Sequence, residues 1–301
     1  MRTAICTISS AGHLYKTRAL FRSLAELTDA DFLCLVTDAE ADVDTVGNIS
    51  MIGLSALDSE MAHAVKNRYR GDRLRWAAKP LLLLHLLDRG YDRLIYVDND
   101  ICFHSSPDFL FGLLDQHSVL LTPHFYLADP ERRQYWLEAN FRIGLFNAGF
   151  VAVNSDARQA VEWWARCCAY NVKKASWRGL FDDQRYLDML PILFDDVHIL
   201  KNRGCNVASW NVELSPRTVG ANGKVLLDGR WPLVFIHFNG FTMRAILKGS
   251  DPLLQPQLDA YFRLLQEFNP QFDPKQITRY SLADGINYLR HLWWILIRKL
   301  D

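Results

Sequence analysis

One apolar stretch that ends in two aspartates constrains the fold of this chain more than any other feature. Residues 94–97 are aliphatic or aromatic, Asp98, Asn99 and Asp100 follow directly, and a second apolar patch begins at Ile101. A continuous apolar run of this length is typical of a β-strand covered on both faces, as in a parallel sheet. The carboxyl ends of such strands open toward a ligand crevice, so we expect both carboxylates to lie there.

The spacing of the two aspartates suits a divalent cation. Asp98 and Asp100 are two residues apart, so in an extended turn both side chains can point toward one ion. Mg²⁺ or Mn²⁺ takes carboxylate oxygens and shares its remaining positions with water or a substrate diphosphate. The alternative is a polar turn at a strand end, where Asp and Asn are common. The apolar flanks favour the metal site.

The first third of the chain alternates between strand and helix patterns. The expected strands are residues 3–8, 31–38 and 49–54, and the expected helices are residues 15–27 and 76–87. This alternation predicts an α/β fold with a mostly parallel sheet flanked by helices. A nucleotide is expected in the crevice above the strands, where Thr7 and Ser9 end the first strand.

Polar clusters recur at the expected ends of later elements. The expected strands are residues 119–122, 150–153 and 233–238, and a small-residue turn at 147–149 precedes the second of them. A short helix is expected to start near residue 180, with Asp182 and Asp183 in its first turn. His237 ends the last strand. It is a candidate third ligand for the cation, although a histidine at such a position is often a structural residue with its hydrogen bonds satisfied.

Composition excludes several classes of protein. The 301 residues include 34 basic and 34 acidic ones, a balance that argues against a nucleic-acid-binding surface. The six cysteines show no metal-ligand spacing, so a reducing, cytoplasmic location is expected. No signal peptide is apparent, and no run of about 18 uncharged apolar residues could span a membrane.

Four motifs, in this order, resemble one enzyme family. They are Tyr-Val-Asp-Asn-Asp at 96–100, Phe-Asn-Ala-Gly at 146–149, Phe-Asp-Asp-Gln at 181–184 and Ile-His-Phe-Asn-Gly at 236–240. Together they resemble glycosyltransferases of the GT-A fold, most of all glycosyltransferase family 8 and related bacterial surface-polysaccharide enzymes. The segment Cys-Asn-Val-Ala-Ser-Trp-Asn at 205–211, before the last expected strand, looks more like the bacterial surface-polysaccharide branch. The resemblance covers residues 1–248. It implies a GT-A, Rossmann-like sheet, a nucleotide-sugar donor that is usually UDP-linked, and a manganese or magnesium ion.

The same resemblance assigns roles to individual residues. As metal ligands it implies Asp98, Asp100 and His237. As catalytic residues near the donor sugar and the reacting face it implies Asn147, Asp183 and Gln184. As residues that bind the nucleotide sugar we expect Thr7, Ser9, Lys79, Asp98, Asn99, Ala148, Gly240, Arg244 and Lys248.

Two features of the cationic residues stay open. The family ending His-Phe-x-Gly-x-x-Lys-Pro-Trp is only half present, because Phe241-Thr-Met-Arg244 follows Gly240. Arg244 or Lys248 could replace the missing lysine at the diphosphate. Lys79, expected near a helix start just before Pro80, is either a second diphosphate clamp or a solvated lysine.

The predicted reaction is transfer of a sugar from a UDP-sugar, or another nucleotide sugar, to a saccharide or lipid-linked saccharide in bacterial surface-polysaccharide or lipopolysaccharide synthesis. Asp183 would act as a base if the enzyme inverts, or stabilise the cationic sugar if it retains. One alternative is a sugar nucleotidyltransferase, which would normally show a Gly-rich, basic phosphate-binding loop near the first strand. The segment Ser9-Ser-Ala-Gly12 resembles such a loop only weakly. The other is a non-catalytic carbohydrate-binding protein.

The chain is expected to divide at residue 250. Residues 1–250 would form the catalytic domain and residues 251–301 a C-terminal helical extension. Between 286 and 300, seven apolar residues that include Trp293 fall on one helical stripe, and the basic residues lie largely off it, which predicts a basic amphipathic helix. Such a helix could lie on the inner face of the cell membrane, pack on the core, or join two copies of the chain.

Overall fold

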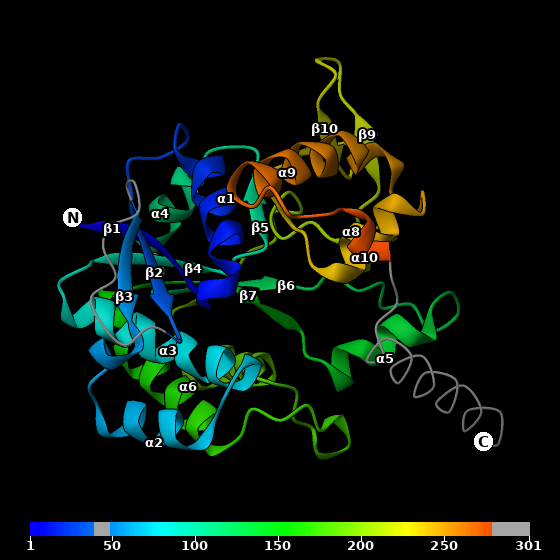
Figure 1. The fold of residues 1–301 in the computed structure, drawn as a ribbon. Coiled ribbons are helices and arrows are strands. Elements are labelled where there is room, and N and C mark those ends of the chain that lie inside the picture. Colours follow the sequence, from blue (N-terminus) through cyan, green and yellow to red (C-terminus); the bar gives the residue numbers. More distant parts are fainter. Residues whose placement is uncertain (39–48, 279–301) are drawn as a thin grey trace.

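The computed structural model describes residues 1–38 and 49–278, and their centre is a seven-stranded sheet (Figure 1). Its strands, in spatial order, are β3 (Ile49–Gly53), β2 (Asp31–Val36), β1 (Thr3–Ser9), β4 (Arg93–Val97), β7 (Phe146–Asn154), β6 (Val119–Pro123) and β8 (Val197–Ile199). Only β7 runs antiparallel to its neighbours. The predicted α/β class, with a mostly parallel sheet flanked by helices, is confirmed.

Helices cover both faces of this sheet, which is why its central strands are mostly apolar. On one face lie α2 (Glu60–Arg68), α3 (Asp72–Asp88) and α6 (Arg158–Tyr170), and on the other lie α1 (Leu14–Leu24) and α4 (Asp108–Leu114). Strand β1 shows the alternation that this requires: Ala4 and Cys6 pack with the α3 and α6 core, and Ile5 packs with the α1 and α4 core.

Two element boundaries differ from the sequence-based expectation. Strand β7 begins at Phe146 rather than at residue 150, because Phe146 pairs with Pro123 and the carbonyl of Gly149 accepts a 2.9 Å bond from the Asp98 N–H. The predicted small-residue turn is therefore part of the strand. Helix α3 begins one turn earlier than expected, at Asp72, so Lys79 lies in mid-helix and not near its start.

A short antiparallel pair brings the late part of the chain to the end of β4. Strand β5 (Ile101–Phe103) follows Asp100, and β12 (Phe235–His237) pairs with it so that His237 lies opposite Ile101. Helix α8 (Gly240–Leu247) follows directly. This pairing, between residues more than 130 apart in sequence, places the predicted third ligand beside the predicted first two.

Residues beyond 250 share a core with the rest of the chain. Helix α9 (Gln255–Phe268) packs on α1, and Tyr261 stacks on Phe238 with ring centroids 4.5 Å apart. The proposed boundary at residue 250 stays a prediction, and the amphipathic segment 286–300 lies outside the described residues. Among the described helices, which also include α5 (Gln134–Arg142), α7 (Leu190–Leu193) and α10 (Lys275–Thr278), none is long and apolar enough to cross a membrane.

A second, small sheet contains β9 (Arg217–Val219), β10 (Val225–Leu227) and β11 (Trp231–Pro232). A buried ion pair connects β9 of this sheet to the C-terminal part of the chain. Arg217 Nε lies 2.9 Å from Asp251 Oδ2, and the two side chains are only 2% and 4% exposed. Removing one partner leaves the other charge buried without compensation.

We therefore expect Asp251→Asn to lower the free energy of unfolding by about 3 kcal/mol or more. The matched control is Asp88→Asn, since Asp88 pairs with Arg158 at the surface and such pairs contribute at most about 1 kcal/mol. Urea denaturation of both variants measures the difference. Equal midpoints for the two would contradict a structural role for the buried pair.

Candidate active site

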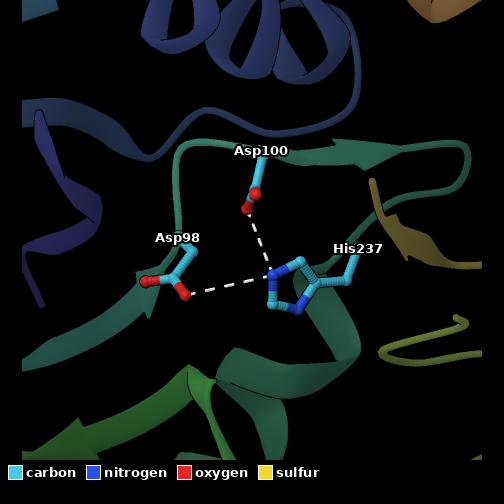
Figure 2. Close-up of side chains that lie close together, drawn as sticks. All are labelled: Asp98, Asp100 and His237. Carbon is cyan, nitrogen blue, oxygen red and sulfur yellow. Dashed lines mark ion pairs between the residues drawn. The ribbon is translucent and has the colours of Figure 1, made fainter. Parts of the chain in front are cut away.

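Three potential ligands converge at the carboxyl end of β4 (Figure 2). Asp98 and Asp100 flank the turn after the strand, and His237 reaches them from β12. His237 Nε2 lies 3.1 Å from Asp100 Oδ1 and 4.0 Å from Asp98 Oδ2. One ligand atom from each residue lies within 4.8 Å of the others. The structure thus brings together the three residues proposed as metal ligands from the sequence.

The chemistry of this trio fits a hard or borderline divalent cation. Two carboxylates and one imidazole suit Mn²⁺, and Mg²⁺ less well, with further positions left for water or a substrate. Burial alone would raise the pKa of Asp100, but the adjoining His237 lowers it to about 2. Burial would lower the pKa of His237, but Asp100 and Asp98 raise it. The two carboxylates thus favour the imidazolium form of His237, whose positive charge lies where a metal cation would bind.

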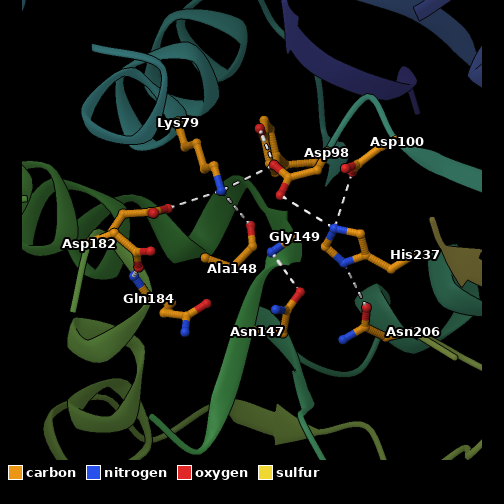
Figure 3. A network of polar contacts seen from close by, with 12 residues as sticks. Lys79, Asp98, Asp100, Asn147, Ala148, Gly149, Asp182, Gln184, Asn206 and His237 are labelled. Atoms are coloured by element: carbon orange, nitrogen blue, oxygen red, sulfur yellow. Dashed lines mark hydrogen bonds and ion pairs between the residues drawn. The ribbon is translucent and has the colours of Figure 1, made fainter. Parts of the chain in front are cut away.

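His237 is held in this position from behind (Figure 3). Its Nδ1 lies 3.3 Å from the side-chain oxygen of Asn206, which is fully buried. Because an amide oxygen only accepts, this contact makes Nδ1 a hydrogen-bond donor and turns Nε2 toward the carboxylates. The other side of the ring lies against Gly149, where a Cβ atom would come within 2.6 Å of the imidazole. Glycine is therefore required at this position.

Asn206 is itself part of a buried polar chain. The Asn211 side chain donates to the Asn206 carbonyl at 2.9 Å, and Arg217 donates to the Asn211 side chain at 3.1 Å. Arg217 in turn pairs with Asp251. Sequence reasoning missed Asn206. The one available signal was that Asn206 lies in the segment Cys205-Asn-Val-Ala-Ser-Trp-Asn211. The resemblance of this segment to bacterial surface-polysaccharide enzymes assigned no role to Asn206.

Lys79 links the trio to a second acidic pair. Its side chain is 4% exposed, so the alternative of a solvated lysine is wrong. Its Nζ lies 3.1 Å from Asp98 Oδ1 and 3.1 Å from Asp183 Oδ2, and donates to the Ala148 carbonyl at 3.0 Å. Burial would lower the pKa of Lys79, but Asp183 and Asp98 outweigh it and raise the pKa. Lys79 is therefore a permanent cation between these two carboxylates.

The expected short helix is the 3-10 helix η5 (Gln184–Met189), which begins after the Asp182–Asp183 pair, so the two acids precede it and do not lie in its first turn. Asp183 makes no side-chain capping bond, so helix initiation does not account for its placement. Burial raises the pKa of Asp183 to about 7, opposed by Lys79 and reinforced by Asp182 and Asp98. Asp182 has φ of 42° and lies 3.5 Å from Lys174 Nζ. The site therefore holds four neighbouring carboxylates.

The other two residues assigned to the reacting face lie beside this pair. The Gln184 side chain donates to the Ile143 carbonyl at 3.2 Å. The Asn147 oxygen accepts from the Gly149 N–H at 3.0 Å, and its amide nitrogen lies 3.2 Å from His124 Nε2. Asn147, Ala148 and Gly149 are consecutive in β7, the strand next to β4, so one segment contacts both Lys79 and His237.

The residues assigned to nucleotide binding divide into two groups. Asn99 donates to the Ser9 hydroxyl at 3.0 Å, which joins the end of β1 to the aspartate turn, and both Ser9 and Thr7 are fully buried in β1. On the opposite side, α8 begins at Gly240, and the Arg244 guanidinium lies against Gly240 and 5.3 Å from the Phe241 ring. Lys248 lies at the far end of α8. This favours Arg244 over Lys248 as a clamp, and the assignment stays a prediction.

No family model matches the chain. YfnD of Bacillus subtilis (strain 168) is 32% identical over 250 residues, which cover 79% of this chain and 77% of YfnD. The chain belongs to the YfnD family. YfnF of the same organism is 28% identical over 297 residues, covering 91% of this chain and 97% of YfnF. Both relatives are named as uncharacterized proteins, so they bring no activity to the site.

Solved structures similar to this member of the YfnD family include glycosyltransferases. Galactosyltransferase LgtC, in complex with donor and acceptor sugar analogues, is 15% identical with a TM-score of 0.49, over 88% of this chain and 96% of LgtC. Mouse xyloside xylosyltransferase 1 is 14% identical with a TM-score of 0.49, over 80% and 99%. Similarity at this level carries no argument about activity, which has to come from the site.

The position of Lys79 leads to a stability prediction. Lys79→Met removes the cation between Asp98 and Asp183, so we expect the free energy of unfolding to fall by about 3–5 kcal/mol. Lys79→Met/Asp183→Asn should recover part of the loss, because one buried charge is then gone. Denaturation midpoints measure both, with the exposed Lys275→Met as control. If the double variant is no more stable than Lys79→Met, Asp183 is not the main charge partner of Lys79.

Proposed function

We propose that the chain is a metal-dependent glycosyltransferase that transfers a sugar from a nucleoside-diphosphate sugar, UDP-linked in the first instance, to a saccharide acceptor. The observation that carries the proposal is the convergence of Asp98, Asp100 and His237 at the end of β4. These residues belong to two segments that the fold brings together, and both segments resemble motifs of glycosyltransferase family 8. A mere polar turn would not require the histidine.

The charge of the leaving group explains why such a site is needed. A nucleoside diphosphate departs with negative charge, and Mn²⁺ or Mg²⁺ held by Asp98, Asp100 and His237 would neutralise it as a Lewis acid. The chain adds its own cations. Arg244 of α8, whose guanidinium lies against Gly240 at the helix start, is our candidate for the second contact with the diphosphate, with Lys248 as the alternative. Asn99, held by its hydrogen bond to Ser9, would contact the nucleoside side of the donor.

Lys79 and Asp183 are proposed to shape the electrostatics of the reacting face. Asp183 is 1% exposed and paired with Lys79, so it is poorly placed to take a proton from an acceptor hydroxyl. Its position better suits stabilisation of positive charge on the sugar as the bond to the diphosphate breaks. Asn147, Ala148 and Gln184 would lie against the donor sugar. This assignment favours the second of the two roles left open by the sequence.

The acceptor is proposed to be a saccharide of a bacterial surface polysaccharide or lipopolysaccharide, free or lipid-linked. The support is the likeness of the Cys205–Asn211 segment to such enzymes, and this segment now has a physical role behind His237. A cytoplasmic enzyme would meet both the nucleotide sugar and an acceptor at the inner face of the membrane.

A donor screen tests the proposal directly. The purified full chain is incubated with Mn²⁺ and single nucleotide sugars, without acceptor, and release of the nucleoside diphosphate is measured. We expect slow hydrolysis of one donor class, because water can replace the acceptor hydroxyl. Pyrophosphate release from a nucleoside triphosphate and a sugar 1-phosphate would instead indicate a nucleotidyltransferase. Sugar binding without any turnover would indicate a carbohydrate-binding protein.

Metal-dependent nucleotide binding is expected to depend on Asp100. Calorimetry with UDP should show Mn²⁺-dependent affinity for the wild type and, in Asp100→Ala, a fall of about tenfold or more toward the metal-free value. Asp156→Ala, at an exposed site after β7, is the matched control and should bind as the wild type does. Unchanged Mn²⁺-dependent affinity in Asp100→Ala would remove Asp100 from the metal site.

Asp183→Asn is expected to lower kcat by about a hundredfold or more while the donor KM changes little. An interaction that strengthens in the transition state affects turnover selectively. Initial rates over a range of donor concentrations separate the two constants, and a thermal melt checks that the fold is intact. A rise in KM at constant kcat would instead assign Asp183 to ground-state binding.

A further inference from the structure

Trp177 is the most exposed tryptophan described in the chain, and no part of the candidate site accounts for it. Trp177 is 86% exposed and lies on the short helix η4 (Ser176–Arg178) at the tip of a turn. The turn is closed by a bridge between Ala175 and Leu180, and Gly179 reverses the chain with φ of 71°. Ordered backbone therefore holds the indole out in solvent, which is unfavourable unless a partner covers it.

The surroundings of Trp177 are basic. From residue 163 to residue 181 the chain contains no acidic residue but includes Lys173, Lys174 and Arg178. The end of α2, the turn after it and the start of α3 add exposed Arg68, Arg70 and Arg73, and the one acidic residue among them, Asp72, is paired with Arg75. These two segments lie side by side: Arg68 donates to the Ala169 carbonyl at 2.9 Å, and Lys174 lies 4.7 Å from the Trp76 ring of α3. We call Arg68, Arg70, Arg73, Lys173, Trp177 and Arg178 the Trp177 face.

We propose that the Trp177 face binds an anionic membrane surface, with the indole of Trp177 in the headgroup region. Tryptophan favours that region because its ring is apolar while its N–H stays hydrated. Basic residues around it are attracted to anionic lipids. The chain as a whole has no net charge, so this attraction is local. A single indole at the tip of a turn suits a broad, soft surface better than the groove of a nucleic-acid-binding protein, which stacks several bases.

The face lies next to the candidate site without being part of it. Lys174, at its edge, is 3.5 Å from Asp182 Oδ2 and 5.0 Å from the Phe181 ring. A membrane bound here would therefore lie along the side of the molecule that carries the acidic cluster, within reach of a lipid-linked substrate. The inference concerns membrane binding only and holds whether or not the chain transfers a sugar.

Co-sedimentation of the full chain with vesicles tests this inference. The vesicles contain phosphatidylcholine with or without about one-third phosphatidylglycerol, and only the anionic ones should bind. Lys173→Glu/Arg178→Glu should lower the partition coefficient by about thirtyfold or more, because each basic residue contributes about fivefold. Trp177→Ala should lower it by about tenfold through lost apolar burial.

Matched controls carry the same changes elsewhere. Lys201→Glu/Lys224→Glu reverses two exposed charges, and Phe109→Ala removes a partly exposed aromatic ring; both should bind vesicles as the wild type does. Thermal melts verify that every variant is folded.

Three outcomes would overturn the inference. The wild type could fail to bind anionic vesicles. Both Trp177-face variants could bind as the wild type does, which would place membrane contact elsewhere, for instance in residues 279–301. The charge reversal could abolish binding while Trp177→Ala has no effect and soluble polyphosphate competes fully, which would make the face a general polyanion site.

Discussion

The buried ammonium of Lys79 is the interaction on which the candidate site depends. It contacts carboxylates from the turn after β4 and from the segment before η5, and a carbonyl of β7. Without it, the buried Asp183 would be an uncompensated anion beside the partly exposed Asp98, an arrangement that is unfavourable in a region of low dielectric. One side chain from the middle of α3 thus fixes the relative positions of three segments. The fold can keep its acidic cluster assembled because this cation is in place.

His237 depends on a separate support from the C-terminal part of the chain. The chain of contacts from Asp251 through Arg217 and Asn211 to Asn206 is buried and reaches the imidazole from the side away from the carboxylates. Each polar group in it has a partner, so it holds one geometry without an unpaired charge. Groups behind a ligand of this kind set its tautomer and orientation. The two halves of the site therefore have independent supports that meet at Asp98 and Asp100.

The sequence predicted those features that depend on local patterns. The apolar run before Asp98 gave β4 and the aspartate turn, and the spacing of apolar residues gave α1 and most of α3. It did not show that Asn147–Gly149 continue β7, because that depends on pairing with β4 and β6. Nor did the sequence show whether Lys79 is buried or solvated, because this depends on which face of α3 carries the residue. Asn206 was missed for the same reason, since its partner lies 31 residues away.

The charge of the assembled cluster has a consequence for what it can bind. Asp98, Asp100, Asp182 and Asp183 carry four negative charges when ionised, and Lys79 and Lys174 compensate two of them. A protonated His237 compensates a third, which leaves one negative charge in a largely buried site. Burial, reinforced by Asp182 and Asp98, raises the pKa of Asp183 to about 7. A divalent cation on Nε2 would replace one proton with two positive charges and bring the cluster to neutrality. The balance of charge, and not only the spacing of the ligands, therefore favours a divalent over a monovalent ion at this site.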